Sequence, residues 1–174
     1  MKKLNLTGVL LLLTIITNAQ FNRAELKVNG LTCSMCSYAT EKQLNTIDFI
    51  DSIGNDLDHT TYILYFKKDA DINSDLIKSK VEDAGFSIGS LIYTANFTNL
   101  KIENNYHLTY KSTLYHFMNV KSVTLNGDVR LKLIDKGFVS DKEFKRYRKM
   151  AEKYPCYQTG KMPDADKVYH LTLI

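Results

Sequence analysis

The sequence predicts an α+β protein in which a βαββαβ unit over residues 20–92 precedes a smaller β-rich unit with one helix over residues 106–174. In the first unit the apolar residues switch between the period of a strand and that of a helix. In the second, short runs of alternating hydrophobicity are separated by turn residues. The chain has 174 residues, 44% hydrophobic and 24% charged, which excludes a disordered chain, a collagen-like repeat and a disulfide-dense scaffold.

Residues 1–19 have the pattern of a cleaved secretory signal peptide. Two lysines follow the first methionine, residues 8–16 are apolar except for one threonine, and residues 17–19 are of the small kind that a signal peptidase reads. The apolar run is too short to cross a ~30 Å hydrocarbon core as a stable helix, although a retained membrane anchor is the alternative. We therefore expect an exported, periplasmic protein that begins at Gln20 and has no membrane span after cleavage.

The segment 20–92 contains six predicted elements. In chain order they are a strand around residues 26–28, a helix from near residue 36 to residue 47, strands over 49–53 and 62–66, a helix over 74–84 and a strand over 86–92. A turn is predicted at residues 54–58, and Gly85 ends the second helix, which Asn73 or Ser74 caps. Two helices on one face of a four-stranded antiparallel sheet would bury both apolar stripes, in a ferredoxin-like arrangement.

The chemistry of this segment lies in residues 30–36, between the first strand and the first helix. Gly30 lets the chain turn, and Leu31 can anchor the loop in the core, which leaves the thiols of Cys33 and Cys36 near the surface. Free N–H groups at the helix N-terminus favour a thiolate there. Two thiolates suit a soft, low-coordination metal such as Cu(I), whereas a structural zinc site needs four ligands and the chain has no second cysteine pair.

Three stretches carry a resemblance to a known family. They are Gly-Leu-Thr-Cys-Ser-Met-Cys at residues 30–36, the pair Glu41 and Leu44, and Val-Glu-Asp-Ala-Gly-Phe at residues 81–86. Together they closely resemble the heavy-metal-associated (HMA) domain over roughly residues 22–92. That family includes copper chaperones, the N-terminal modules of copper-exporting ATPases and the periplasmic mercury-binding protein. Because order and spacing agree along the whole segment, the likeness is more specific than a lone CxxC motif.

The resemblance implies that Cys33 and Cys36 are the metal ligands. Leu31 replaces the family's usual methionine, and Phe86 stands where the family carries an aromatic residue or lysine beside the metal loop. Thr32 occupies the position where zinc- and cadmium-type members tend to carry aspartate. This favours Cu(I), with Hg(II), Ag(I) or Zn(II) as the other metals that two thiolates accept.

Two other roles for this cysteine pair remain open. In an exported protein the two thiols could form a disulfide. They could also act as a redox pair, but thioredoxin-like folds place a cis-proline opposite their CxxC motif, and the chain's prolines, Pro155 and Pro163, lie outside residues 20–92. Met35, between the cysteines, is expected to cover the loop rather than to act as a third ligand.

Residues 93–105 are polar and predict a linker to the β-rich unit, although residues 92–97 could instead extend the last strand of the first unit. In chain order the later elements are β-formers over 108–120, a tight hairpin centred on Asn126-Gly127, a helix from a Ser140–Glu143 capping box to Pro155, and a strand over 169–173. Such a unit suggests a partly open barrel of the oligonucleotide/oligosaccharide-binding (OB) type. It contains no functional motif that we identify.

Six residues after the linker could bind a second metal if the fold gathered them: His107, His116, Met118, Cys156, Met162 and His170. A strand would place His116 and Met118 on one face, since side chains two apart share a face. The sequence does not show whether the others converge. The ordinary outcome is isolated histidines on a sheet and a methionine in the core, and Cys156 could be buried, free or paired with another chain.

Charge is divided unevenly between the two parts of the chain. Residues 20–99 contain seven Lys and Arg against eleven Asp and Glu, whereas residues 100–174 contain fourteen against eight. The two parts could attract each other, or the basic part could seek another acidic surface. Six basic residues lie in the helix predicted over residues 141–154, where a solvated face is the usual reason and docking to an acidic partner or anionic lipid is the alternative. Nucleic acid is not expected, because no base-reading motif is present.

The sequence thus predicts an exported heavy-metal-binding protein that carries or sequesters Cu(I) through Cys33 and Cys36 by thiolate ligand exchange. Its partner would be a metal-transfer protein such as a metal transporter. We do not expect an enzyme, because no nucleophile–base pair or open catalytic metal position is visible. The alternatives are an interaction or adaptor module whose basic C-terminal part recruits a partner, and a thiol–disulfide redox protein.

Overall fold

The computed structural model describes residues 19–56 and 60–174. The predicted signal peptide, residues 1–19, lies outside these ranges except for its last residue, so export stays a prediction. Within the described ranges no helix is both long and apolar enough to span a membrane.

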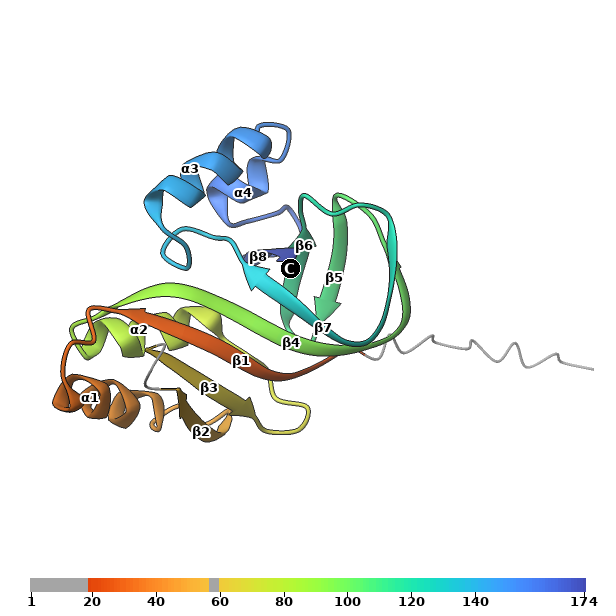
Figure 1. Cartoon of the computed structure of the whole chain (residues 1–174). Helices are drawn as coiled ribbons and strands as arrows, with labels where there is room; N and C mark the ends of the chain where they lie inside the picture. The colour runs from red at the N-terminus through yellow and green to blue at the C-terminus, as the bar shows by residue number, and fades with distance from the viewer. Residues whose placement is uncertain (1–18, 57–59) are drawn as a thin grey trace, which may run out of the picture.

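The first six elements follow the predicted βαββαβ order: β1 (Gln20–Asn29), α1 (Ser34–Leu44), β2 (Ile50–Asp56), β3 (Thr61–Phe66), α2 (Ser74–Asp83) and β4 (Ser87–Ile102). The strands are antiparallel in the order β2-β3-β1-β4, and both helices cover one face (Figure 1). The turn predicted at residues 54–58 is wrong for Gly54 to Asp56, because these residues continue β2 and pair with β3.

The second helix of this unit has the cap that the sequence predicts. The side chain of Asn73 accepts a hydrogen bond from the backbone N–H of Leu76 at 3.0 Å, and Gly85 follows the helix at φ +88°. Asn73→Ala should lower the free energy of unfolding by about 1 kcal/mol, since a helix N–H loses its partner. Urea unfolding measures this loss, and Asn73→Asp, which keeps an acceptor, is the control. Equal stability of the Asn73→Ala and wild-type chains would contradict it.

The remaining elements are β5 (Tyr106–Tyr110), β6 (Thr113–Phe117), β7 (Val123–Leu133), α3 (Asp141–Met150), α4 (Pro155–Thr159) and β8 (Val168–Leu173). They extend the same sheet, whose full order is β2-β3-β1-β4-β7-β8-β6-β5. Only the pairing of β6 with β8 is parallel among the described ladders. The described strands thus form one sheet with β2 and β5 at its edges, and a separate β-rich unit with a partly open barrel is not confirmed.

The linker predicted over residues 93–105 is wrong up to Ile102, because β4 continues to that residue and pairs with β7; the alternative, an extension of the strand over residues 92–97, is the one found. Tyr93, Ala95 and Phe97 are each at most 1% exposed, so the polar residues of this stretch alternate with core residues. A separate C-terminal domain is not confirmed, because the sheet runs through both parts of the chain.

The hairpin predicted at Asn126-Gly127 is also wrong, since both residues lie inside the single strand β7. Gly127 still adopts a backbone conformation that favours glycine, with a φ of +75°. It lies opposite a β-bulge, where β4 carries an extra residue between Phe97 and Leu100. Pro155, expected to close the preceding helix, instead opens α4 as its first residue.

Two hydrophobic cores lie on opposite faces of the C-terminal strands. The larger core is shared by both parts of the chain: the Phe21 ring on β1 stacks on Tyr115 of β6 at 5.0 Å between centroids and meets Tyr93 of β4 edge-on at 5.3 Å. The smaller core lies beneath α3 and α4 and contains Met118, Ile134, Val139, Tyr147, Ala151 and Tyr157. Alternation along β6 sends Tyr115 to the larger core and its neighbour His116 to the opposite face.

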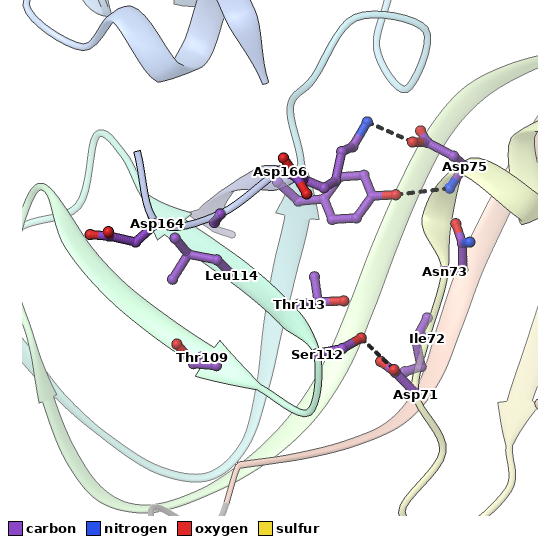
Figure 2. Close-up of a pocket in the computed structure, with 13 residues that line it drawn as sticks. Asp71, Ile72, Asn73, Asp75, Thr109, Ser112, Thr113, Leu114, Asp164 and Asp166 are labelled. Atoms are coloured by element: carbon purple, nitrogen blue, oxygen red, sulfur yellow. Dashed lines mark hydrogen bonds and ion pairs between the residues drawn. The ribbon is translucent and has the colours of Figure 1, made fainter. Parts of the chain in front are cut away.

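Ion pairs join the acidic and the basic part of the chain, as their opposite net charges predict. In each pair the acid comes from residues 20–99 and the base from residues 100–174: Glu25–Arg130 at 2.6 Å, Asp75–Lys167 at 2.6 Å and Asp69–Lys111 at 3.9 Å. Figure 2 shows the groove at this junction, where Ser112 donates a hydrogen bond to Asp71. The predicted attraction is confirmed, although each exposed pair adds at most about 1 kcal/mol.

Candidate functional site

The loop between β1 and α1 takes the form that its residues predict. Gly30 has a φ of +89°, and a Cβ atom there would lie 3.4 Å from the Phe86 ring, so the loop backs closely onto that side chain. Leu31 is partly buried against the larger core. The loop is therefore anchored on its inner side, and residues 32–35 are exposed.

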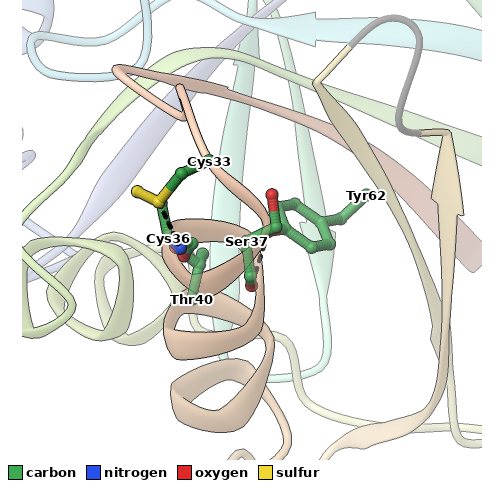
Figure 3. The surroundings of a disulfide bond; sticks show 5 residues. All are labelled: Cys33, Cys36, Ser37, Thr40 and Tyr62. Atoms are coloured by element: carbon green, nitrogen blue, oxygen red, sulfur yellow. Dashed lines mark hydrogen bonds between the residues drawn. A yellow bond between two sulfur atoms is a disulfide. The ribbon is translucent and has the colours of Figure 1, made fainter.

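Cys33 and Cys36 lie together at the N-terminus of α1, where the structure joins them in a disulfide (Figure 3). Their Cα atoms are 5.2 Å apart. Cys33 is the N-cap residue, and its sulfur accepts a hydrogen bond from the backbone N–H of Cys36 at 3.2 Å. Cys33 is exposed and Cys36 is partly exposed. The disulfide is one of the alternatives that the sequence left open, and it makes the metal role depend on reduction.

Hydrogen bonds hold the first turn of α1 behind the cysteines. The Thr40 hydroxyl donates to the carbonyl oxygen of Cys36 at 3.1 Å, and the Tyr62 hydroxyl donates to that of Ser37 at 2.9 Å (Figure 3). Burial raises the pKa of Tyr62, which keeps this hydroxyl a donor. These contacts fix the helix N-terminus, so the two sulfurs have a rigid base.

The surroundings of the loop are open on one side. A cleft of about 290 Å³ lies beside it and is lined by Leu31, Thr32, Cys33, Ser34, Ser37, Asp56, Thr60, Thr61 and Tyr62. Apart from Cys33, this described lining contains no cysteine and no histidine. Met35 and Tyr38 are 71% and 62% exposed, so apolar side chains surround the cysteines at the surface. Such an arrangement is accessible to a metal ion and to a partner protein.

Three of the six further candidates converge on the opposite side of the sheet. His116, Cys156 and His170 bring donor atoms within 4.8 Å of one another. His107 stacks on His116 at 4.3 Å between ring centroids, so it lies next to the cluster without being one of its three possible ligands. The other two do not join: Met118 packs in the smaller core, and Met162 lies in a bridge with Ala165.

The two clustered histidines have opposite pKa shifts. Burial, reinforced by His107 and His170, lowers the pKa of His116 to about 3. Burial acts in the same direction on His170, but hydrogen bonds to Asp135 and Cys156 outweigh it and raise that pKa to about 9. The sequence does indicate that each of these histidines points to the opposite face from its neighbours, since His116 and His170 alternate with apolar residues in strands. It contains no sign that β6 and β8 are parallel neighbours.

The basic side chains of α3 extend mainly into solvent. Glu143 pairs with Lys132 at 2.6 Å and with Arg146 at 3.9 Å, while Arg148 and Lys149 are exposed. A solvated face and a docking face both fit this arrangement, and partner recruitment stays a prediction.

No protein-family profile matches the chain, and no curated protein matches it. Among solved structures, the chain is similar to the yeast copper transporter domain CCC2A, determined in apo and Cu(I)-loaded states (26% identity, 37% of this chain and 88% of that chain, TM-score 0.34). It is also similar to the CopZ metallochaperone (27%, 38% and 97%, TM-score 0.35) and to the N-terminal domain of ZntA in its apo form (20%, 39% and 89%, TM-score 0.34). These matches cover 37–39% of the chain and are consistent with the predicted heavy-metal-associated segment, and nothing about the remaining residues follows from them.

Proposed function

We propose that the protein is an exported heavy-metal carrier in which reduced Cys33 and Cys36 bind one Cu(I) and pass it to a partner by ligand exchange, without a catalytic step. The observation that supports this most directly is the meeting of two cysteine sulfurs at an exposed helix N-terminus. Export rests on the signal-like pattern of residues 1–19.

Metal capture begins from the dithiol form of the loop. A thiol reductant supplies two electrons and two protons, which open the disulfide to two thiols. The thiols lose their protons as Cu(I) binds, because thiolate is the ligand form. The N–H of Cys36 that donates to Cys33 and the positive end of α1 both stabilise the negative charge. In the described cleft lining no further cysteine or histidine joins the two sulfurs, and two thiolates alone suit the low coordination number of Cu(I).

Transfer follows from the low coordination number. A two-coordinate Cu(I) leaves room for a thiolate or thioether of a partner, so the metal can pass through a three-coordinate intermediate without first dissociating. A partner must approach within bonding distance of the sulfurs, and the loop is exposed on its outer side. Met35 and Tyr38 provide apolar surface next to the cysteines for that contact.

Titration of the reduced chain with Cu(I), followed by native mass spectrometry, tests this proposal. The loop should hold one Cu(I) ion, and Cys33→Ser or Cys36→Ser should abolish that binding because half of the ligand set is lost. Cys156→Ser is the matched control, because it removes the third cysteine and leaves both loop thiols. If Cys33→Ser leaves the number of bound ions unchanged while Cys156→Ser lowers it, the loop is not the carrier site.

A further inference from the structure

The register of the C-terminal strands places histidines side by side on the face away from the larger core. His107 of β5 is the antiparallel partner of His116 on β6, and His116 is the parallel partner of His170 on β8. Side chains at paired positions lie on the same face of a sheet, so the three rings form a row. Helix α4 crosses this face (Figure 1) and contributes Cys156 to the row.

The donor atoms are spaced as ligands of one ion. Cys156 Sγ lies 3.3 Å from His116 Nδ1 and 3.5 Å from His170 Nε2. In a tetrahedral site with metal–sulfur and metal–nitrogen bonds of ordinary length, a sulfur and a nitrogen ligand lie about 3.6 Å apart. The three side chains are at most 9% exposed. An ion could therefore enter the cluster with only small movements of its ligands.

The ring of His170 is oriented by a carboxylate on the side away from Cys156, as is common for metal-binding histidines. Its Nδ1–H donates to Asp135 Oδ1 at 2.7 Å, and its backbone N–H donates to the other oxygen of the same carboxylate at 2.7 Å. This fixes the ring and directs Nε2 towards Cys156. The proton shared between Nε2 and the thiol is the one that an entering metal ion would release.

His116 leaves a polar group without a partner. In the described part of the chain its Nε2 is buried without a hydrogen bond, and so is Nε2 of His107. A buried unpaired ring nitrogen costs about 1–3 kcal/mol. Apolar side chains would fill this space at lower cost, so a row of histidines around a thiol calls for a function.

We propose that His116, Cys156 and His170 form a second, buried metal site that takes one thiophilic transition-metal ion, either three-coordinate Cu(I) or Zn(II) with a non-protein ligand in its fourth position. One thiolate and two imidazoles suit both ions. Because the ligands come from β6, α4 and β8, a bound ion ties α4 to the sheet. Cys156, His170 and Asp135 also have the order of a nucleophile, base and orienting acid, but a thiol at 9% exposure suits a buried metal site better than attack on a substrate.

The test uses the reduced Cys33→Ser/Cys36→Ser chain, in which the loop site is absent. Titration with Cu(I) and, separately, with Zn(II) should give one bound ion by native mass spectrometry. Cys156→Ser in this background should abolish that binding. His107→Gln is the matched control, because it alters the row of rings without removing a ligand, and it should still bind one ion.

A positioning role for Asp135 is tested in the same background. Asp135→Asn should weaken metal affinity about 10- to 100-fold, as loss of a carboxylate behind a ligating histidine does. With Co(II) as the probe, the thiolate charge-transfer band should persist at saturation, because Cys156 remains a ligand. A merely structural effect of the variant would remove the band as well.

Three results would overturn the second site. They are no uptake of either ion by the Cys33→Ser/Cys36→Ser chain, uptake that survives Cys156→Ser, and rapid alkylation of Cys156 by iodoacetamide in the folded, metal-free protein. The first needs no variant of the buried cluster, so it decides the matter even if Cys156→Ser fails to fold. The carrier role of the loop does not depend on any of them.

Discussion

With Cys33 and Cys36 joined as a disulfide, the loop should bind no Cu(I), and reduction by a thiol reductant should restore one bound ion. Oxidation to the disulfide removes two electrons from the sulfurs and leaves two neutral, weakly donating atoms in place of two thiolates, so the loop lacks the soft anionic ligands that Cu(I) needs. The effect is complete loss rather than a shift in affinity. It is measured by Cu(I) titration of oxidised and reduced samples of the Cys156→Ser chain, where the buried cluster does not contribute.

The control for this experiment separates redox state from fold. Circular dichroism of the two samples should agree, because the turn is held by Thr40 and Tyr62 as well as by the disulfide. Oxidised and reduced chains that take up Cu(I) equally would show that the cysteine pair is not the ligand set. Release of loop-bound Cu(I) on oxidation would show that the two states compete for the same sulfurs.

The N-terminal part of the fold could be predicted because its signals are local. Strand and helix periods in residues 20–92 are regular, Asn73 and Gly85 mark the ends of α2, and Cys33 and Cys36 are three residues apart on one turn. The turn expected at Gly54 to Asp56 failed because pairing with β3 outweighs the turn preference of these residues.

In the C-terminal part the Ser140 cap of α3 and the strand β8 could be predicted from local signals, but the order of the strands could not, because it is set by distant partners. Polar residues from Thr94 onwards resemble a linker until β7 pairs with them, and Gly127 resembles a hairpin until β4 lies alongside. The buried cluster depends on the same long-range order. His116 and His170 are 54 positions apart in sequence and meet only through the parallel register of β6 and β8.

Phe21→Ala should destabilise the whole chain by about 3–5 kcal/mol, which is a large share of the 5–15 kcal/mol typical of a folded domain. Phe21 is 2% exposed, and its ring contacts Tyr93, Tyr110 and Tyr115, so truncation opens a cavity in the core that both parts of the chain share. Denaturant unfolding gives the loss of stability. Tyr38→Ala, which truncates an exposed aromatic ring, should change it by no more than about 0.5 kcal/mol.

Hydrogen exchange resolved by peptide shows which parts unfold together in this variant. If β1, β4 and β7 form one cooperative sheet, protection in β3 and in β8 should fall by the same factor, even though neither strand pairs with the other. Loss of protection restricted to residues 20–92 would instead mean that the C-terminal strands are stable without β1. Metal taken up by the loop could then leave the buried cluster unaffected, whereas a shared core couples the stability of both sites.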